Sequence, residues 1–596
     1  MTSILDRKTI DFILFDMLSV EQQCGAGRYQ DHDRQSLDAV LDLAQRLSED
    51  ELWPHATLSD TREPQLVEGQ ARILPEAKDA LAKLREAGFF AAHADYELGG
   101  MQLPVSVNHA CNGMMKGANV STHAYMSLTR AAGNLLKAHG TDWQKWVYME
   151  PMLEGRFFGT MCLSEPDAGS SLADIRTRAK NMGDGTYHLT GSKMWISGGD
   201  QDVSENIVHL VLARLPDAPP GVRGISLFAV PKYLVNEDGS LGARNGIVTA
   251  GLNHKMGYRG TTNCLLSLGD PAPAIGTLVG KENHGLATMF HMMNEARIGV
   301  GIGAAMLGSV GYRYSLNYAQ ERRQGRTLSN RDPLSKPVLL IEHADVRRML
   351  LRQKALSEGA IALCLYAGDL VDRSILTDDP AEKERLAALL DLLTPVVKSW
   401  PSEFGLDANR EAIQILGGYG YTREFPVERL YRDNRLNMIH EGTNGIQALD
   451  LLGRKIIGNG MKSLDIFRQE VATTLAEARD QDALKPHCAR LEQMLSDLTK
   501  TAESVAETMQ SASKDQALAH ASAYLNAFGH FVVAWLWVRM ASTAALQPAG
   551  RDEAFLTGKK TACAFFLQHE LPQAQAWLEI AGDDTSLLAN ATAEVF

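Results

Sequence analysis

The chain has 596 residues, of which 45% are hydrophobic and 22% are charged, and its formal net charge at pH 7 is -13. A chain of this length exceeds what a single hydrophobic core supports, so we expect several domains. The acidic balance argues against a protein whose main role is to hold nucleic acid or an anionic membrane surface. The composition is typical of a soluble globular enzyme.

The N-terminus and the cysteines favour a cytoplasmic protein. Residues 1–7 lack the charged, apolar and small-residue segments of a signal peptide. Seven scattered cysteines form no CxxC pair and no spacing suited to zinc, so we expect reduced thiols and no metal site. The most apolar run, residues 531–538, is far shorter than the roughly 20 residues that a membrane span needs. It predicts a buried helix and no membrane span.

The N-terminal part is predicted to be helical. An arm at residues 1–35 precedes a region in which apolar side chains recur at helical spacing, as at Leu37, Val40 and Leu41. We therefore expect a helical N-terminal domain at residues 36–158.

Residues 159–285 change to short β-type runs separated by turns, which predicts a central β-barrel-like domain. The runs expected to be strands are 159–163, 187–196, 207–212, 225–230 and 264–268. Asp184 and Gly185 lie directly before one of these runs and form a hairpin-type turn signal.

Helical patterns resume and predict a C-terminal helical bundle at residues 286–458. Within it, Asp379 and Pro380 supply an N-cap and a proline at the first helical position. After a glycine-rich break, residues 459–596 are again helical, with Leu491, Leu498 and Val505 on one face. The predicted fold class is α+β: a helical N-terminal domain, a central β domain, a helical bundle and an additional C-terminal helical domain.

One carboxylate lies in an unusual local sequence. Glu441 is flanked by Met438, Ile439 and Ile446 in a glycine-rich turn, so we expect poor solvation that disfavours its charged form and suits a base near neutral pH. Gly442 and Gly445 leave room for a planar ligand close to the backbone. The alternative is a helix end with an exposed glutamate and capping glycines. Residues 439–447 alone support both interpretations.

The turn resembles the catalytic-base segment of the acyl-CoA dehydrogenase family, and three further segments of that family follow the family's order along the chain. Residues 161–170 resemble the flavin-contacting loop, and residues 195–197 resemble the strand end beside the flavin ring. Residues 414–429 resemble the segment that reaches the adenosine-pyrophosphate end of flavin across a subunit interface. The arm and the C-terminal extension match the longer bacterial branch of the family, which includes enzymes acting on 3-methylthiopropionyl-CoA.

The resemblance implies FAD as cofactor, an acyl-CoA substrate and a homodimer. It implies that Glu441 removes the α proton, that FAD accepts the hydride, and that the product is a trans-2-enoyl-CoA whose electrons pass to an electron-transfer flavoprotein. The positions that match cofactor contacts are Met161, Leu163, Ser164, Gly169, Ser170, Trp195, Ile196, Ser197, Arg322, Gln414, Gly417, Gly418 and Thr443. The positions that match substrate contacts are Ser170, Asn294, Arg297 and Gly442.

Simpler interpretations of these residues exist outside the resemblance. Serine and glycine are common turn residues, Trp195 is expected in a core, and Arg297 is expected on a solvated helix face. Gly299 to Gly303 form a weak dinucleotide fingerprint inside a helical pattern, so close helix packing explains them better.

The chain departs from the family at four positions. His440 replaces a common aromatic residue, and the phenylalanine usual before Gly325 is missing. Gly445 and Ala344 stand where many relatives carry glutamine. The contacts to the adenine half of FAD therefore cannot be carried over.

Two alternative functions share the expected fold. An acyl-CoA oxidase would use the same base and flavin but let oxygen reach the reduced ring. A DNA-associated flavoprotein would favour a basic C-terminal domain, whereas residues 459–596 carry 11 Lys and Arg against 17 Asp and Glu. The extension is expected to pack against the catalytic part of the chain, either as a structural clamp or near the substrate entrance.

Overall fold

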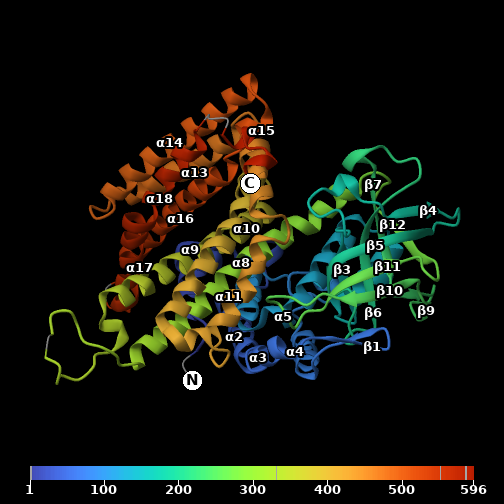
Figure 1. The fold of residues 1–596 in the computed structure, drawn as a ribbon, viewed down its shortest axis with the longest axis horizontal. Helices are drawn as coiled ribbons and strands as arrows, with labels where there is room; N and C mark the ends of the chain where they lie inside the picture. Colours follow the sequence, from blue (N-terminus) through green and yellow to red (C-terminus); the bar gives the residue numbers. More distant parts are fainter. Residues whose placement is uncertain (1–2, 331, 549, 551, 584–586) are drawn as a thin grey trace. The chain divides into compact units, whose positions relative to one another are not determined.

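The computed structural model describes residues 3–330, 332–548, 550, 552–583 and 587–596. They divide into two compact units, which appear in Figure 1 as a mainly helical part and a part that contains the sheet. The helical unit comprises Met1–Leu41, Val105–Gly113 and Val300–Phe596. The sheet unit comprises Asp42–Pro104 and Met114–Gly299. Two long helices, α5 and α8, contribute residues to both units.

The strands are β1 (Gln65–Val67), β2 (Gln70–Arg72), β3 (Phe157–Cys162), β4 (Arg178–Asn181), β5 (Tyr187–Ser197), β6 (Asn206–Arg214), β7 (Ile225–Pro231), β8 (Tyr233–Val235), β9 (Leu241–Arg244), β10 (Ile247–Leu252), β11 (Asn263–Leu268) and β12 (Ala274–Val279). The helices up to the bundle are α1 (Arg7–Asp11), α2 (Arg34–Leu47), α3 (Ala56–Thr61), α4 (Pro75–Glu86), α5 (Val105–His139), α6 (Asp142–Gln144), α7 (Glu150–Leu153) and α8 (Gly285–Glu321).

The later helices are α9 (Ala344–Leu376), α10 (Pro380–Leu416), α11 (Val427–Arg435), α12 (Asn444–Leu449), α13 (Lys462–Ala478), α14 (Lys485–Ser511), α15 (Lys514–Ala517), α16 (Ala521–Ala545), α17 (Glu553–Phe565), α18 (Pro572–Ala581) and α19 (Leu587–Asn590). A 3-10 turn, η11 (Leu436–Met438), lies between α11 and α12. This order of elements confirms the expected fold class, with a central β-rich region between helical regions.

The main sheet has the strand order β10-β11-β5-β12-β7-β6-β3, and β4 pairs with both β5 and β6. Its neighbouring strands are antiparallel except for β3 with β6 and β4 with β6. The predicted hairpin forms, since β4 and β5 pair across the turn that contains Gly183 and Gly185, both with positive φ. The short pairs β1 with β2 and β8 with β9 were not predicted, because their strands are brief and largely exposed or half-buried.

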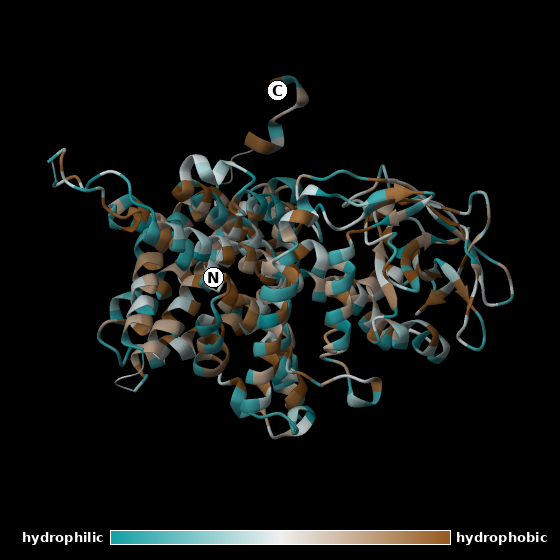
Figure 2. Cartoon of the chain, turned by 90° about the horizontal axis from the view of Figure 1, so that it is seen from below, coloured by the Kyte–Doolittle hydropathy of each residue, from teal (hydrophilic) through white to brown (hydrophobic). Residues whose placement is uncertain are grey.

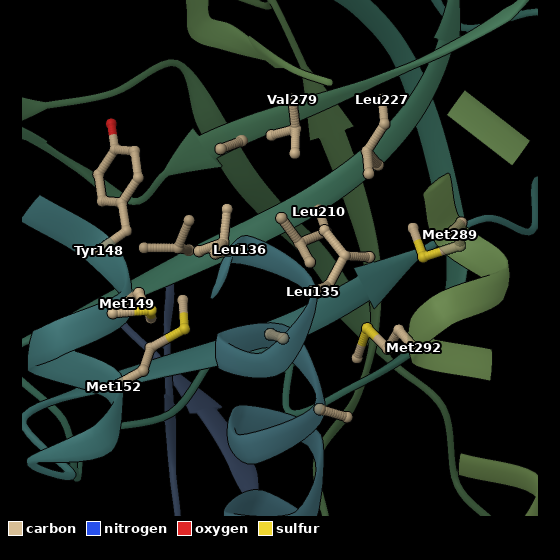
Figure 3. Close-up of a cluster of buried hydrophobic side chains, with 14 of the residues drawn as sticks. Leu135, Leu136, Tyr148, Met149, Met152, Leu210, Leu227, Val279, Met289 and Met292 are labelled. Carbon is tan, nitrogen blue, oxygen red and sulfur yellow. The ribbon is translucent and has the colours of Figure 1, made fainter. Parts of the chain in front are cut away.

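The central strands β6 and β7 are buried along almost their whole length, which explains their continuous apolar sequences. Figure 2 shows many strand residues of this unit in brown, the hydrophobic end of the scale. Successive side chains point to opposite faces, so Leu210 of β6 joins one core cluster and Val211 joins another. Figure 3 shows Leu210 and Leu227 of the sheet in one cluster with Leu135 of α5 and Met289 of α8.

The C-terminal extension packs on the bundle within the helical unit. Helix α16 contacts α9, α10 and α12 as well as α14, α17 and α18. At its contact with α10, a Cβ added to Gly529 would lie 2.6 Å from Cδ1 of Trp400, and the Trp400 indole donates to Nδ1 of His530 at 3.0 Å. The expected burial of the extension against the catalytic part of the chain is therefore confirmed.

The expected buried helix at residues 531–538 is the middle of α16, and these residues are buried. Among the described helices, the stretch Lys514–Ala545 is long and apolar enough to cross a membrane by length and composition, but 83% of its apolar window is buried within the protein. Burial of this kind is what the core helix of a packed bundle shows.

The N-cap predicted for the bundle is confirmed. The Asp379 side chain accepts a hydrogen bond from the Ala381 amide at the start of α10, and Pro380 occupies the first turn. Close packing also explains the glycine run in α8, since a Cβ on Gly301 would lie 2.0 Å from the Val397 carbonyl oxygen.

Candidate active site

Glu441 lies in a tight turn of the helical unit between η11 and α12. Its φ is 55°, and Gly442 follows with a φ of 86°. Thr443 caps α12, because its hydroxyl accepts a hydrogen bond from the Ile446 amide at 3.3 Å. A left-handed conformation costs a non-glycine residue about 1–2 kcal/mol, so the surroundings must hold this turn in place. Such strain is a recognised feature of functional sites.

The Gln447 side chain stabilises the turn through hydrogen bonds to its backbone. Its Nε2 donates to the carbonyl oxygens of Glu441 at 3.0 Å and of Gly442 at 3.4 Å. The Gln447 side chain is fully buried, and a Cβ on Gly442 would approach its Nε2 to 2.7 Å. Gly442 is therefore required both by its φ and by the space that the glutamine amide occupies.

The next residue anchors the start of α12 to α10. The Asn444 amide donates to Oε2 of Glu403 at 3.0 Å, and its Oδ1 accepts from Nζ of Lys398 at 3.4 Å. Burial raises the pKa of the Glu403 carboxyl above its usual value. The turn is thus fixed on one side by Gln447 and on the other by two charged residues of α10.

The apolar surroundings expected for Glu441 are only partly present in the chain itself. Glu441 and Met438 are partly buried, but Ile439 is 52% exposed and Ile446 is 37% exposed. The two flanking isoleucines are too exposed to shield the carboxylate from solvent within the chain itself. Their side chains are available for apolar contact with a bound molecule.

The loop predicted to contact flavin follows β3 in the sheet unit. The Met194 amide of β5 donates to the Ser164 carbonyl at 3.0 Å. Met161 and Leu163 pack against the core cluster shown in Figure 3, whereas Gly169 and Ser170 are exposed. The structure therefore brings the loop beside the strand that carries the second predicted segment.

A buried ion pair fixes this loop. Lys193 of β5 donates to Oε1 of Glu165 at 2.8 Å and to the Leu163 carbonyl at 3.0 Å, and the lysine side chain is fully buried. Glu165 also accepts from the amides of Arg176 at 2.6 Å and Thr177 at 3.0 Å. Burial tends to raise the pKa of Glu165, but Lys193 and these donors outweigh it, so the pKa is below its usual value.

The second segment, at the end of β5, presents one ring outward. Trp195 is 58% exposed with a φ of 65°, so it is not the core tryptophan that its type suggests. Ile196 is buried, which leaves only its backbone for a ligand contact. The Ser197 hydroxyl accepts from Nδ2 of Asn263 at 3.4 Å. An exposed indole on strained backbone is a suitable platform for a planar ring.

Four predicted cofactor residues meet in one pocket of the helical unit. Arg322, Gln414, Gly417 and Gly418 line a pocket of about 560 Å³. A Cβ added to Gly417 or Gly418 would meet no atom within 4 Å, so their backbone is open to an approaching ligand. An exposed guanidinium beside open glycine amides suits a phosphate group. Tyr419 and Thr422, which lie within the predicted segment 414–429 but were not named as contacts, line the same pocket, as does Tyr318, which was not predicted.

Of the two predicted substrate residues on α8, the structure describes the side chain of one. Arg297 is 4% exposed, so it is not the solvated helix residue of the simpler interpretation. Asn294 lies on α8, and its side chain is outside the described part of the structure. Among the described residues, no group of His, Cys, Asp and Glu could hold a metal ion.

Models of one protein family match nearly the whole chain. The N-terminal, middle and C-terminal domains of acyl-CoA dehydrogenase match residues 35–156, 160–270 and 283–457. The model described as acetyl-CoA dehydrogenase C-terminal like matches residues 467–591.

Relatives and solved structures are similar over the same length. The chain is 36% identical to 3-methylmercaptopropionyl-CoA dehydrogenase of Ruegeria pomeroyi over 92% of each chain. It is 33% identical to the broad-specificity linear acyl-CoA dehydrogenase FadE5 of Mycobacterium tuberculosis over 94% of each chain. Two structures share the fold: Caenorhabditis elegans ACDH-11 in complex with C11-CoA (TM-score 0.78, 18% identity, 99% and 95% coverage) and Bacillus anthracis acyl-CoA dehydrogenase complexed with FAD (TM-score 0.72, 20% identity, 95% and 90% coverage).

The ion pair of the flavin loop predicts a pH dependence of flavin retention. The pKa of folded Glu165 is below the ordinary value of 4.5, so its contribution is present above that value and is lost as the pH falls through the folded pKa. Acidification should therefore release flavin from the wild type. The double variant Glu165→Gln with Lys193→Met should show a weaker dependence, measured by the fluorescence of released flavin.

Asp167→Asn is the matched control, because Asp167 lies in the same loop but is 76% exposed. It should keep the acid release curve of the wild type. An unchanged curve in the double variant would show that the pair does not hold the loop.

Proposed function

Because the chain belongs to the acyl-CoA dehydrogenase family of FAD-dependent oxidoreductases, we propose that Glu441 is the base in the oxidation of an acyl-CoA to its trans-2-enoyl-CoA. The observation that carries this role is the position of Glu441 on a strained turn held by Gln447. A carboxylate fixed by its backbone can be held against a substrate carbon with little loss of orientation. The relatives named above differ in acyl group, so a panel of acyl-CoAs is needed to assign the substrate.

The proposed reaction divides the work between the protein and its cofactor. Glu441 takes the α proton, and its backbone amide donates to the thioester carbonyl oxygen, where negative charge develops. No amino-acid side chain accepts hydride, so FAD supplies that acceptor when bound. The hydrogen bond from Gln447 to the Glu441 carbonyl restrains the backbone that carries both the carboxylate and this amide.

The residues present fit the cofactor at both of its ends. Exposed Trp195 and the adjoining Ser164 and Ser197 would hold the ring, and the buried pair beneath the loop keeps these residues in place. Arg322 and the open backbone of Gly417 would hold phosphate and nucleotide.

The role of Glu441 is tested by Glu441→Gln. The amide cannot accept a proton, so reduction of the flavin by acyl-CoA should fall by about 10²- to 10⁴-fold, while the flavin spectrum stays normal. The measurement is anaerobic stopped-flow absorbance at the flavin band. Glu477→Gln, at an exposed glutamate of α13 in the same unit, should reduce at the wild-type rate. Equal rates for the two variants would remove Glu441 from the role.

We also propose that the electrons leave to an electron-transfer flavoprotein. The alternative is an oxidase, in which oxygen takes them directly. Turnover should be rapid with an electron-transfer flavoprotein or an artificial dye under nitrogen, and slow with oxygen alone. Stoichiometric peroxide from air at the same rate would favour the oxidase.

A homodimer is the proposed assembly, because residues 414–418 match a segment that serves the partner's flavin in the family. The pocket lined by Gln414, Gly417 and Gly418 supports this proposal. Since the extension covers α9 and α10, a dimer is favoured over a tetramer. Sedimentation should give the mass of two chains, and a monomer that still binds flavin tightly would contradict the assignment.

A further inference from the structure

A chain of buried amides leads to the residue before the proposed base. Nδ2 of Asn409 on α10 donates to the Leu307 carbonyl of α8 at 2.9 Å. Nδ2 of Asn434 on α11 donates to Oδ1 of Asn409 at 2.8 Å and to the Ala304 carbonyl at 3.1 Å. The three asparagines of the chain, Asn409, Asn434 and Asn437, are each fully buried.

The chain ends on His440. Nδ2 of Asn437 donates to Oδ1 of Asn434 at 2.9 Å, and Oδ1 of Asn437 lies 3.0 Å from Nε2 of His440. The direction of every bond is fixed, because the carbonyls of Ala304 and Leu307 can only accept. Each asparagine must then turn its oxygen toward the next residue. Nε2 of His440 therefore carries the hydrogen and donates to Asn437.

The helices leave space for these amides at two glycines. A Cβ on Gly311 would lie 2.5 Å from Nδ2 of Asn409. A Cβ on Gly405 would lie 2.7 Å from the Ala304 carbonyl and 3.2 Å from Nδ2 of Asn434. The chain of amides is thus part of the packing of α8, α10 and α11, and hydrogen bonds between buried side chains make such packing rigid.

We propose that His440 is a positioning residue for Glu441, held as the Nε2–H form by Asn409, Asn434 and Asn437. The proposal rests on the role of Glu441 as base. His440 directly precedes Glu441, so its bond to Asn437 restrains the chain before Glu441, whereas Gln447 bonds the carbonyls of Glu441 and Gly442. Loss of this bond removes one restraint on the chain that enters the left-handed residue, so that the carboxylate is held less closely against the substrate carbon.

Exchange of the substrate's α hydrogens with deuterated water isolates this role. A 3-thiaacyl-CoA has sulfur at the β position, so the base can exchange its α hydrogens but no oxidation follows. His440→Leu should lower the exchange rate, and with an ordinary acyl-CoA the rate of flavin reduction, by about 10- to 100-fold. The dissociation constant of the analogue, the flavin spectrum and the melting temperature should not change. His440→Gln keeps an N–H donor and should restore most of the exchange.

Asn437→Ala removes the other partner of the bond between His440 and Asn437, and it replaces His440→Leu as the test if that variant does not fold. It should slow exchange at least as much as His440→Leu, and the double variant should be no slower than Asn437→Ala, because that variant already removes the bond between His440 and Asn437. Thr394→Val is the matched control. It removes the hydrogen bond that the buried Thr394 hydroxyl donates to the Leu390 carbonyl on α10, away from the chain of amides, and should exchange at the wild-type rate.

Three results would overturn the proposal: wild-type exchange in His440→Leu, equal loss in His440→Gln, or losses that multiply in the double variant. Glu441→Gln distinguishes a failure of this proposal from a failure of the proposed role of Glu441 as base. A wild-type exchange rate in Glu441→Gln would overturn the assignment of Glu441 as the base. If exchange is lost in Glu441→Gln but stays at the wild-type rate in His440→Leu, only the role of His440 is overturned.

Discussion

The left-handed backbone at Glu441 is the constraint on which the helical part of the site depends. An isolated glutamate avoids this conformation, and one net hydrogen bond contributes only about 0.5–1.5 kcal/mol, so a single contact barely offsets the strain. The structure supplies several, through the two carbonyls bonded by Gln447, the N-cap of Thr443 and the anchoring of Asn444 on α10. The geometry of the proposed base is therefore set by several hydrogen bonds of its neighbours and not by Glu441 alone.

The C-terminal extension contacts the helices that hold the turn of Glu441. Helix α10 carries Lys398, Glu403 and Asn409, which reach the turn directly or through other amides. Its face at Trp400 is covered by α16, closely enough that Gly529 cannot bear a side chain without displacement. Helix α16 also contacts α12, the helix that begins beside the base. The extension therefore packs directly on two helices, α10 and α12, whose residues hold the turn of Glu441.

Much of the fold was predictable because its signals are local. The Asp379 cap, the turn before β5 and the apolar run of α16 each depend on a few neighbouring residues, and each is confirmed. The brief strands β8 and β9 carry little apolar pattern and were not predicted. Trp195 was expected in the core by residue type alone, but the turn of the backbone at the end of β5 directs it outward.

The candidate site also has a part that local sequence signals predict and a part that they do not. Glu441 and the glycine turn could be found from local sequence, whereas the contacts that hold them join residues far apart in the chain. Asn434 bonds Ala304 across 130 positions, and Lys193 bonds Glu165 across 28. Asparagine and lysine are mostly surface residues, so their sequence carries no sign of burial. His440 has a polar partner in Asn437, which in turn donates to Asn434, and these contacts are visible only once the helices are packed.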